Sequence, residues 1–262
     1  APRGARATPD AARFSIPSRA TPGPAPGVAR IQHVVAMEMK VLSDEVAACR
    51  RCPRLVEWRE RVGVEKRRAY RDQEYWARPV PAFGDPAARL MVLGLAPAAH
   101  GANRTGRLFT GDRSGDFLYA AMHRAGYASQ ATSTDRADGL VLRDAWVTAA
   151  VKCAPPDNKP LPDERDACAG FIHRELALLP GVRAIVCLGG FAYEAAVRLL
   201  RGAGYTLPHP LPKFGHGVLV PVQDGPTLVL SYHPSQQNTF TGRLTPAMLD
   251  DVFAAARTVI EG

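Results

Sequence analysis

The chain has 262 residues, of which 46% are hydrophobic and 22% are charged, and these ordinary proportions exclude a wholly disordered or fibrous chain. No run of about 18 apolar residues occurs, so no membrane-spanning helix is predicted. The 33 basic and 25 acidic side chains give a formal net charge of +8 at pH 7, which favours an anionic partner such as nucleic acid or a membrane surface.

The N-terminal segment differs in composition from the rest of the chain. Residues 1–30 hold six prolines, three glycines and five arginines but only one acidic residue. Such a composition buries too little apolar surface to offset the chain entropy lost on folding, so we predict a flexible basic arm. The arm is either a solubilising tail or a segment that helps to hold a polyanion. Its start lacks the apolar segment of a secretory signal, and residues 31–262 are expected to form a single domain.

Two segments follow the arm before the first predicted strand. Apolar residues recur at helical spacing from Ile31, which predicts a helix that reaches Cys49. Residues 58–71 read WRERVGVEKRRAYR, a dense basic stretch with aromatic residues. This stretch is either a solvated face or a phosphate contact.

Four short apolar runs predict the strands of the core. Each run is rich in Leu or β-branched residues and ends in Gly, Pro or polar residues. Continuous apolar runs of this length are typical of parallel strands that are buried on both faces. The predicted strands are LMVLGL at 90–95, WVTAAV at 146–151, AIVCLGG at 184–190 and TLVLSYHP at 227–234, with a short edge strand at 218–222.

Helical patterns lie between and after these runs, at 116–125, 163–179, 191–200 and 246–260. Thr245 is placed to cap the last helix, with Pro246 at its first position. This alternation predicts an α/β fold with a mostly parallel central sheet of about four strands, covered by helices on both faces. Ligands bind at the carboxyl ends of the strands in such folds, so the residues that follow each run are the candidates for chemistry.

Four of the five cysteines have a spacing that indicates a metal centre. Cys49 and Cys52 form a C-x2-C pair after the first helix, whereas Cys153 and Cys168 follow the second strand at a wider spacing. Four thiolates bind zinc or an iron–sulfur cluster, and the lack of a second C-x2-C pair favours a 4Fe–4S cluster. The alternative is a set of unrelated buried thiols. No partner redox motif accompanies them, so we expect a structural role, and Cys187, within a strand, is expected in the core.

The segment after the first strand, GLAPAAHGANRTGRLFTGD at 94–112, contains few bulky side chains. A loop of Gly, Ala and Pro lets the backbone approach a flat ligand closely. Arg104 and Arg107 are placed to contact phosphate, and Phe109 offers a face on which a base can stack. The alternative is an elaborate turn with Phe109 in the core.

The segment after the fourth strand, SYHPSQQNTFTGR at 231–243, has a similar character. His233 follows the strand and Pro234 ends it, while Asn238 adds a donor and an acceptor. A single histidine is commonly structural, but its position at a strand end, opposite a Gly-rich loop, favours a role in binding or catalysis.

Taken together, the motifs GLAPAxHGxNRTGRxFTGD, VKCAPPxNKP and HPSxxNT resemble those of a family 5 (type B) uracil-DNA glycosylase. The four cysteines fit the cluster that this family shares with its family 4 relatives. The resemblance covers about residues 45–260. It implies a three-layer α/β/α sandwich with a short parallel sheet, a structural 4Fe–4S cluster and action on deaminated bases in DNA.

The resemblance also implies how the site works. The base leaves the DNA stack, and its N-glycosidic bond then breaks with positive charge on the sugar and negative charge on the base. His233 is expected near uracil O2, where it stabilises the leaving anion, and Asn238 is expected to orient water or the base. The expected base-binding residues are Gly94, Ala96, Pro97, Phe109 and Ala149. The expected DNA contacts are Arg104, Arg107, Ser235, Gln236 and Arg243.

Ala96 stands where many relatives in the wider superfamily carry an acidic or amide side chain that handles the attacking water. Alanine cannot do so, which leaves Asn103 and Asp112 as the candidates. A carboxylate is the better general base or cation stabiliser, which favours Asp112. Alternatively, Asp112 caps the helix that follows it.

Two alternatives to a glycosylase stay open: a non-enzymatic iron–sulfur DNA-binding module, and a covalent uracil-trapping relative in which His100 bonds to the sugar. Family 4 relatives tend to carry an amide at the position of Ala149. Its absence predicts a broader pocket that also accepts hypoxanthine, unless Asn158 or Asn238 reaches the base edge. We expect a monomer that acts on single- or double-stranded DNA containing a deaminated base, in the cytoplasm at the nucleoid, without membrane contact.

Overall fold

The computed structural model describes residues 26–262, which contain one sheet of six strands in the order β1-β3-β2-β4-β6-β5. The strands are β1 (Phe83–Gly84), β2 (Leu90–Gly94), β3 (Ala145–Ala149), β4 (Ala184–Leu188), β5 (Leu219–Val220) and β6 (Thr227–Ser231). The four longer strands pair in parallel, whereas β1 and β5 pair antiparallel at the two edges. The predicted α/β class with a mostly parallel central sheet is therefore confirmed.

The sheet differs from the prediction in its number of strands and in where they end. The described part of the chain has six strands rather than about four, because a two-residue strand such as β1 leaves no apolar run in the sequence. The edge strand expected at 218–222 is present as β5. The run at 146–151 extends past the end of β3, because Ala150 and Val151 stay buried after the strand has ended.

The expected helices are present, together with shorter ones that the apolar pattern does not reveal. In residues 26–262 the α-helices are α1 (Pro26–Ala48), α2 (Pro53–Glu65), α3 (Ala102–Thr105), α4 (Arg113–Arg124), α5 (Pro162–Ala177), α6 (Gly190–Gly202), α7 (Gln236–Phe240) and α8 (Pro246–Glu261). Two 3-10 turns are η1 (Arg68–Tyr70) and η2 (Pro156–Asn158). Thr245 caps α8 as predicted, and the basic stretch at 58–71 falls on α2 and η1.

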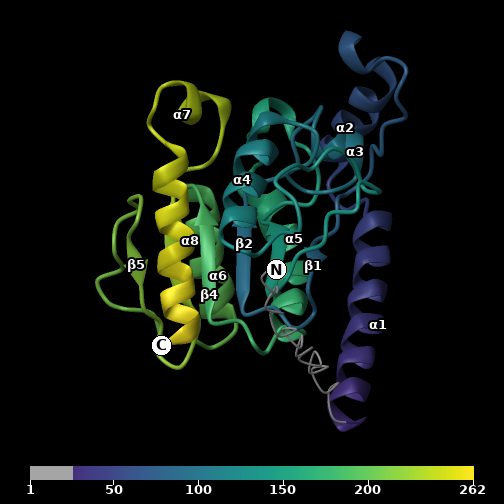
Figure 1. Ribbon diagram of the computed structural model, residues 1–262. Helices are drawn as coiled ribbons and strands as arrows, with labels where there is room; N and C mark the ends of the chain where they lie inside the picture. Colours follow the sequence, from purple (N-terminus) through teal and green to yellow (C-terminus); the bar gives the residue numbers. More distant parts are fainter. Residues whose placement is uncertain (1–25) are drawn as a thin grey trace, which may run out of the picture.

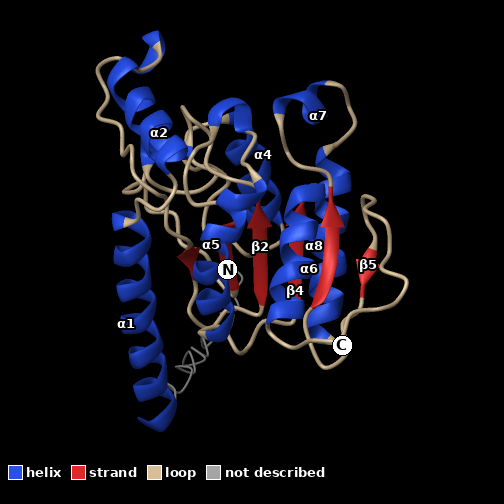
Figure 2. Cartoon of the chain, turned by 180° about the vertical axis from the view of Figure 1, so that it is seen from behind, coloured by secondary structure: helices blue, strands red, loops and turns tan. Residues whose placement is uncertain are grey.

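Helices cover both faces of the sheet and make a three-layer α/β/α sandwich (Figure 1 and Figure 2). On one face α4 packs against α8, and Leu90 and Val92 of β2 lie in the same core cluster. On the other face α5 packs against α6, with Met91, Leu93 and Cys187 in that core, and α1 lies alongside α5. Both faces of each long strand are buried, which explains the continuous apolar runs.

The first helix starts earlier than the sequence pattern indicates. Residues 1–25 of the expected arm lie outside the described residues, whereas residues 26–30 belong to α1, so the helix begins within the last part of the predicted arm. Pro26 suits the first position of a helix, where its missing N–H group would have no partner within the helix. Within residues 26–262, no helix is both long and apolar enough to cross a membrane.

Candidate active site

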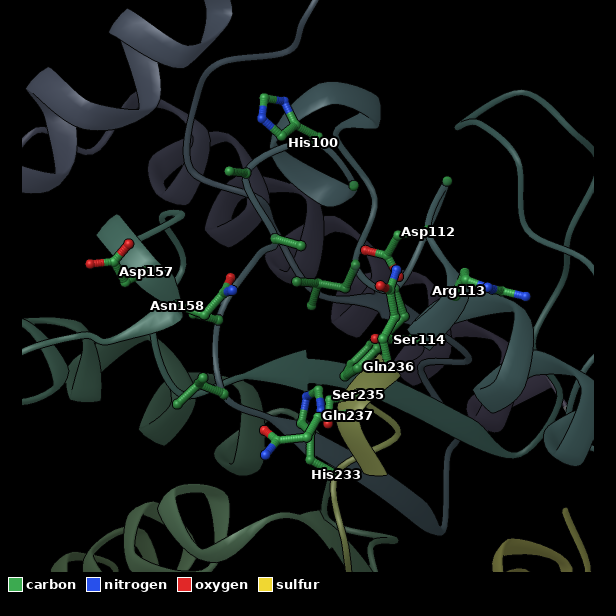
Figure 3. A pocket seen from close by; sticks show the side chains of 18 of the residues that line it. His100, Asp112, Arg113, Ser114, Asp157, Asn158, His233, Ser235, Gln236 and Gln237 are labelled. Atoms are coloured by element: carbon green, nitrogen blue, oxygen red, sulfur yellow. The ribbon is translucent and has the colours of Figure 1, made fainter. Parts of the chain in front are cut away.

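A pocket of about 690 Å³ lies at the carboxyl ends of the parallel strands. Its walls come from the segments that follow β2, β3 and β6 and from the start of α4 (Figure 3). Arg67 and Tyr70, from the basic stretch, complete one side. The parallel strands thus bring together loops that are far apart in the sequence, which is the usual position of a ligand site in an α/β sheet.

Phe109 contributes an aromatic wall, and the protein holds it in an unfavourable backbone conformation. Its φ of 51° lies in the left-handed region, which costs a residue with a side chain about 1–3 kcal/mol. Two glycines make room for it. A Cβ on Gly94 would lie 2.6 Å from the Phe109 Cζ, and a Cβ on Gly115 would overlap the Phe109 carbonyl oxygen. The ring centroid of Phe109 consequently lies 6.1 Å from that of His233.

His233 lines the pocket from the loop that follows β6 (Figure 3). Burial lowers the pKa of its imidazole to about 4, so the ring is neutral near pH 7 and carries one N–H donor. The Asn238 Nδ2 donates to the His233 carbonyl oxygen at 2.8 Å. Asn238 is not among the residues that line the pocket, and its expected role at the water or the base stays a prediction. In this structure its amide fixes the loop that carries His233.

Asp112 lines the pocket and caps α4 at the same time. Its Oδ1 accepts from the Gly115 N–H at 3.0 Å, and its Oδ2 lies against Gly101, where a Cβ would overlap it. Burial raises the pKa of Asp112, opposed in part by the main-chain N–H groups of Gly115 and Ser114. The two roles that the sequence offered as alternatives are therefore compatible.

Asn103, the other candidate for handling water, is fully buried and does not line the pocket. Its Nδ2 donates to the Arg59 carbonyl oxygen at 3.2 Å. The amide joins α3 to α2, its buried Oδ1 has no hydrogen-bond partner in the part of the chain that the structure describes, and its expected role at the attacking water stays a prediction.

Arg104 and Arg107, the two expected phosphate contacts of the Gly-rich loop, are engaged within the protein. Arg104 donates to Gln73 Oε1 at 2.5 Å and to two carbonyl oxygens of its own loop at 2.8 Å each. Arg107 is buried and forms an ion pair with Asp138 at 2.5 Å. Although burial acts to raise the pKa of Asp138, Arg107 and main-chain N–H groups hold it at about 2. Both guanidinium groups therefore stabilise the loop itself, and their contact with phosphate stays a prediction.

Other cations are exposed near the pocket. Arg67 and Arg113 are both exposed and line it. Arg67 belongs to the basic stretch at 58–71 that the sequence offered as a phosphate contact, whereas no sequence pattern marked Arg113. Arg113 stacks on the exposed ring of Phe240 at 4.5 Å, and Arg243 stacks on Tyr232 at 4.6 Å. Arg243 is exposed but does not line the pocket, so its contact with DNA stays a prediction.

The expected base-binding residues divide into two groups. Ala96 and Phe109 line the pocket. Gly94, Pro97 and Ala149 are buried and do not line it, so their contact with the base stays a prediction. Gly94 pairs with Ala149 in the ladder between β2 and β3 and lies against the Phe109 ring. Residues with small side chains are needed at these positions because they lie behind the side chains that form the pocket wall.

The loop after β3 contributes two pocket residues, Asp157 and Asn158. Both adopt the left-handed conformation, with φ values of 53° and 55°, and such strain clusters at functional sites. Figure 3 places the Asn158 side chain across the pocket from Asp112. From the sequence, Asn158 was named only as a residue that could reach the base edge. The pattern that could have identified it as a pocket residue is the PPDN turn after a predicted strand. Ser235 and Gln236 line the pocket from the loop after β6.

The four cysteines of the predicted metal centre carry free thiols and line one small hollow. Cys49 follows α1, Cys52 is the N-cap residue of α2, Cys153 follows β3 and Cys168 lies in α5. Burial raises the pKa of Cys153 to about 12, while Arg59, which donates to its Sγ at 3.0 Å, acts in the opposite direction. Among the described residues, no three His, Cys, Asp or Glu side chains lie close enough together to hold a single metal ion.

Comparison with known proteins identifies the family of the chain. Residues 81–257 match the Uracil DNA glycosylase superfamily. The chain is 57% identical over 217 residues to the type-5 uracil-DNA glycosylase of Mycobacterium tuberculosis, an alignment that covers 82% of this chain and 80% of that relative. It is 50% identical over 221 residues to the type-5 uracil-DNA glycosylase of Thermus thermophilus, covering 84% of this chain and 98% of the relative. The chain belongs to the uracil-DNA glycosylase superfamily and, within it, to the type-5 family.

Proposed function

We propose that the protein hydrolyses the N-glycosidic bond of uracil in DNA and so starts base excision repair. The observation that carries this proposal is a single pocket lined by an aromatic ring, a neutral histidine and a carboxylate. An enzyme that acts on a base in DNA first takes that base out of the stack, and a cavity of about 690 Å³ accommodates a base with its sugar. The relatives named as type-5 uracil-DNA glycosylases support the same activity.

His233 stabilises the leaving base. When the N-glycosidic bond breaks, the bonding electron pair departs with the base, and negative charge develops on the uracil oxygens. A neutral imidazole N–H that is already in place donates to that charge without reorganisation. Because the charge exists only late in the reaction, the donor stabilises the transition state more than the bound substrate. The Phe109 ring, 6.1 Å from the imidazole, provides a face on which the base stacks.

Asp112 acts on the sugar side of the bond. Its Oδ1 is held by the N-terminus of α4, and its Oδ2 lies against Gly101, another residue of the pocket wall. A fixed carboxylate stabilises the positive charge on the sugar and accepts a proton from the water that attacks the anomeric carbon. Among the pocket residues, Asp112 is favoured over Asp157, because Asp157 is exposed.

We propose that the pocket accepts uracil and also other deaminated bases, hypoxanthine among them. An amide at Asn158 was the exception that would restrict the pocket to uracil, but its carbonyl acceptor and N–H donor stand side by side at the wall and do not distinguish the two bases. Uracil presents N3–H next to O4, and hypoxanthine presents N1–H next to O6, so one amide pairs with either edge. Mismatched lesions are favoured as substrates, because less pairing energy opposes flipping.

We also propose that Cys49, Cys52, Cys153 and Cys168 hold a 4Fe–4S cluster. The residues fit the group, because four free thiols line one hollow and a buried cation, Arg59, donates to one of them. When bound, the cluster ties four segments of the chain together through iron–thiolate bonds.

The test of the proposed activity is incubation of the iron-replete protein with a duplex that contains one uracil. Release of uracil and an abasic strand that is cut by mild alkali are expected, with no cutting of the same duplex carrying thymine. A shifted but intact duplex would instead identify a DNA-binding module. A covalent adduct would identify trapping by His100, which lines the pocket and lies 3.1 Å from the Tyr75 hydroxyl through its Nδ1. A parallel duplex with one hypoxanthine tests the breadth of the substrate range.

A further inference from the structure

Arg59 is a buried cation whose protein partners neutralise it only in part. Its side chain is 2% exposed, in the middle of α2. Within the described residues its one ion pair is with Glu60, at 3.5 Å, and Glu60 is already bound by both terminal nitrogens of Arg50. The Arg59 Nε is buried and has no hydrogen-bond partner in the part of the chain that the structure describes. A buried guanidinium with so little counter-charge destabilises the fold unless another negative group is present.

The Arg59 guanidinium lies at the cysteine hollow. Its Nη1 donates to the Cys153 Sγ at 3.0 Å and to the Cys49 carbonyl oxygen at 3.2 Å. A neutral thiol is a weak hydrogen-bond acceptor, whereas a thiolate bound to iron is anionic and accepts a charge-assisted bond. The position of Arg59 is therefore suited to anionic sulfur.

Two cations, Lys152 and Arg51, line this hollow, and both have other partners. The Lys152 ammonium donates to Glu175 at 2.7 Å and to Thr148 at 2.6 Å, so its charge is neutralised within the protein. Arg51 is exposed to solvent and stacks on Phe171. Arg59 lies beside the hollow, and unlike these two cations it donates directly to a cysteine sulfur, that of Cys153.

We propose that Arg59 is a positioning residue of the cysteine centre, whose guanidinium is the internal counter-charge of the bound cluster and fixes the Cys153 sulfur. This inference rests on the proposed 4Fe–4S cluster. The main chain of Arg59 also supports α3, because its carbonyl oxygen accepts from Asn103 Nδ2. Hydrogen bonds to cluster sulfur and nearby positive charge favour the more reduced, more negative cluster and raise its reduction potential.

The experiment compares Arg59→Met and Arg59→Lys with Arg61→Met, a control on the same helix whose side chain is 47% exposed and pairs only with helix neighbours. Iron per chain and the midpoint potential are measured on purified, iron-replete protein by anaerobic titration with redox mediators. Arg59→Met is expected to weaken electron uptake at least tenfold, a fall of about 59 mV for a one-electron couple. Arg59→Lys, which keeps the charge, should stay closer to wild type, and Arg61→Met should not shift.

If Arg59→Met does not retain iron, Arg59→Lys decides. Retention of iron by Arg59→Lys supports the role of Arg59 as a counter-charge, whereas loss of iron from both variants overturns that role. An Arg59→Met protein with the iron content and potential of the wild type also overturns the inference, while the cluster itself stands. A wild-type protein that binds no iron overturns both proposals, and the glycosylase assay with uracil DNA decides the activity separately.

Discussion

The environment of His233 sets its chemistry before any substrate is bound. We expect His233→Ala to lower the single-turnover rate of uracil release about 100- to 1,000-fold, the usual cost of losing one donor to a developing anion. Affinity for the uracil-containing duplex should change much less, because the anion is absent from the bound substrate. Rapid-quench kinetics and a binding titration on the same duplex measure the two quantities. Equal losses in rate and in affinity would assign His233 to binding alone.

Gly94 shows how a residue outside the pocket controls its shape. Gly94→Ala places a methyl group 2.6 Å from the Phe109 Cζ, so the ring has to move away from the base. We expect a lower excision rate, whereas Gly170→Ala, a glycine of α5 with open space around it, should leave activity unchanged and add up to about 1 kcal/mol of stability. Excision assays and thermal unfolding of both variants test this. Wild-type activity in Gly94→Ala would mean that Phe109 need not stay in place.

At the level of elements, the sequence predicted what a local pattern can encode. β2, β4 and β6 follow from apolar runs, and α8 follows from Thr245 and Pro246. β1, α3 and α7 are short, and their pairing depends on partners elsewhere in the chain, so no periodicity marks them.

The residues of the candidate site also divide into those that a local sequence pattern marks and those that it does not. His233, Asp112 and Phe109 lie in the segments that follow predicted strands, and all three line the pocket. No sequence pattern marks the internal contacts of Arg107 and Asn103, because their partners Asp138 and Arg59 are distant in sequence and only the fold brings them together. An arginine in a Gly-rich motif has the same sequence pattern whether it binds phosphate or an internal carboxylate.

The Phe109 segment depends on the buried ion pair of Arg107 and Asp138. We expect Arg107→Gln to lower the free energy of unfolding at pH 7 by about 1–3 kcal/mol, because Asp138 loses its cation but keeps its main-chain N–H donors. The pKa of Asp138 is held at about 2, below its ordinary 3.8, so the pair stabilises the fold above pH 4 and this contribution is lost as the pH falls toward 2. Denaturant unfolding from pH 7 to pH 2 should show the two proteins converging. A constant difference across that range would contradict the ion-pair explanation.

At the scale of the whole molecule, the net charge of +8 predicts binding to DNA that weakens steeply with salt. We expect Arg67→Gln and Arg113→Gln each to reduce the slope of log affinity against log salt by about 0.9 on duplex DNA, since each removes one phosphate contact at the pocket rim. Arg107→Gln, although it removes the same charge, should leave the slope unchanged. Fluorescence anisotropy between low and moderate salt measures all three slopes. A single common slope for the three variants and the wild type would exclude Arg67 and Arg113 from phosphate contact.

The cysteine centre joins parts of the chain that the sheet does not connect. Cys49 and Cys52 lie at the junction of α1 and α2, whereas Cys153 and Cys168 belong to the strand and helix of the central sandwich. A cluster held by all four would close a loop of about 100 residues, which restricts the unfolded chain strongly.

We therefore expect Cys168→Ala to abolish iron binding and to lower the unfolding temperature of the whole chain, rather than to loosen one loop. Cys187→Ala is the matched control, because Cys187 is equally a buried thiol but lies in β4, away from the hollow. Its variant should lose some core packing yet keep its iron and its visible absorbance. Treatment with a strong iron chelator should lower the unfolding temperatures of the wild type and of Cys187→Ala to that of Cys168→Ala or below. The unfolding temperature of Cys168→Ala itself should not change. Equal unfolding temperatures of Cys168→Ala and iron-loaded wild type would mean that the centre does not hold these segments together.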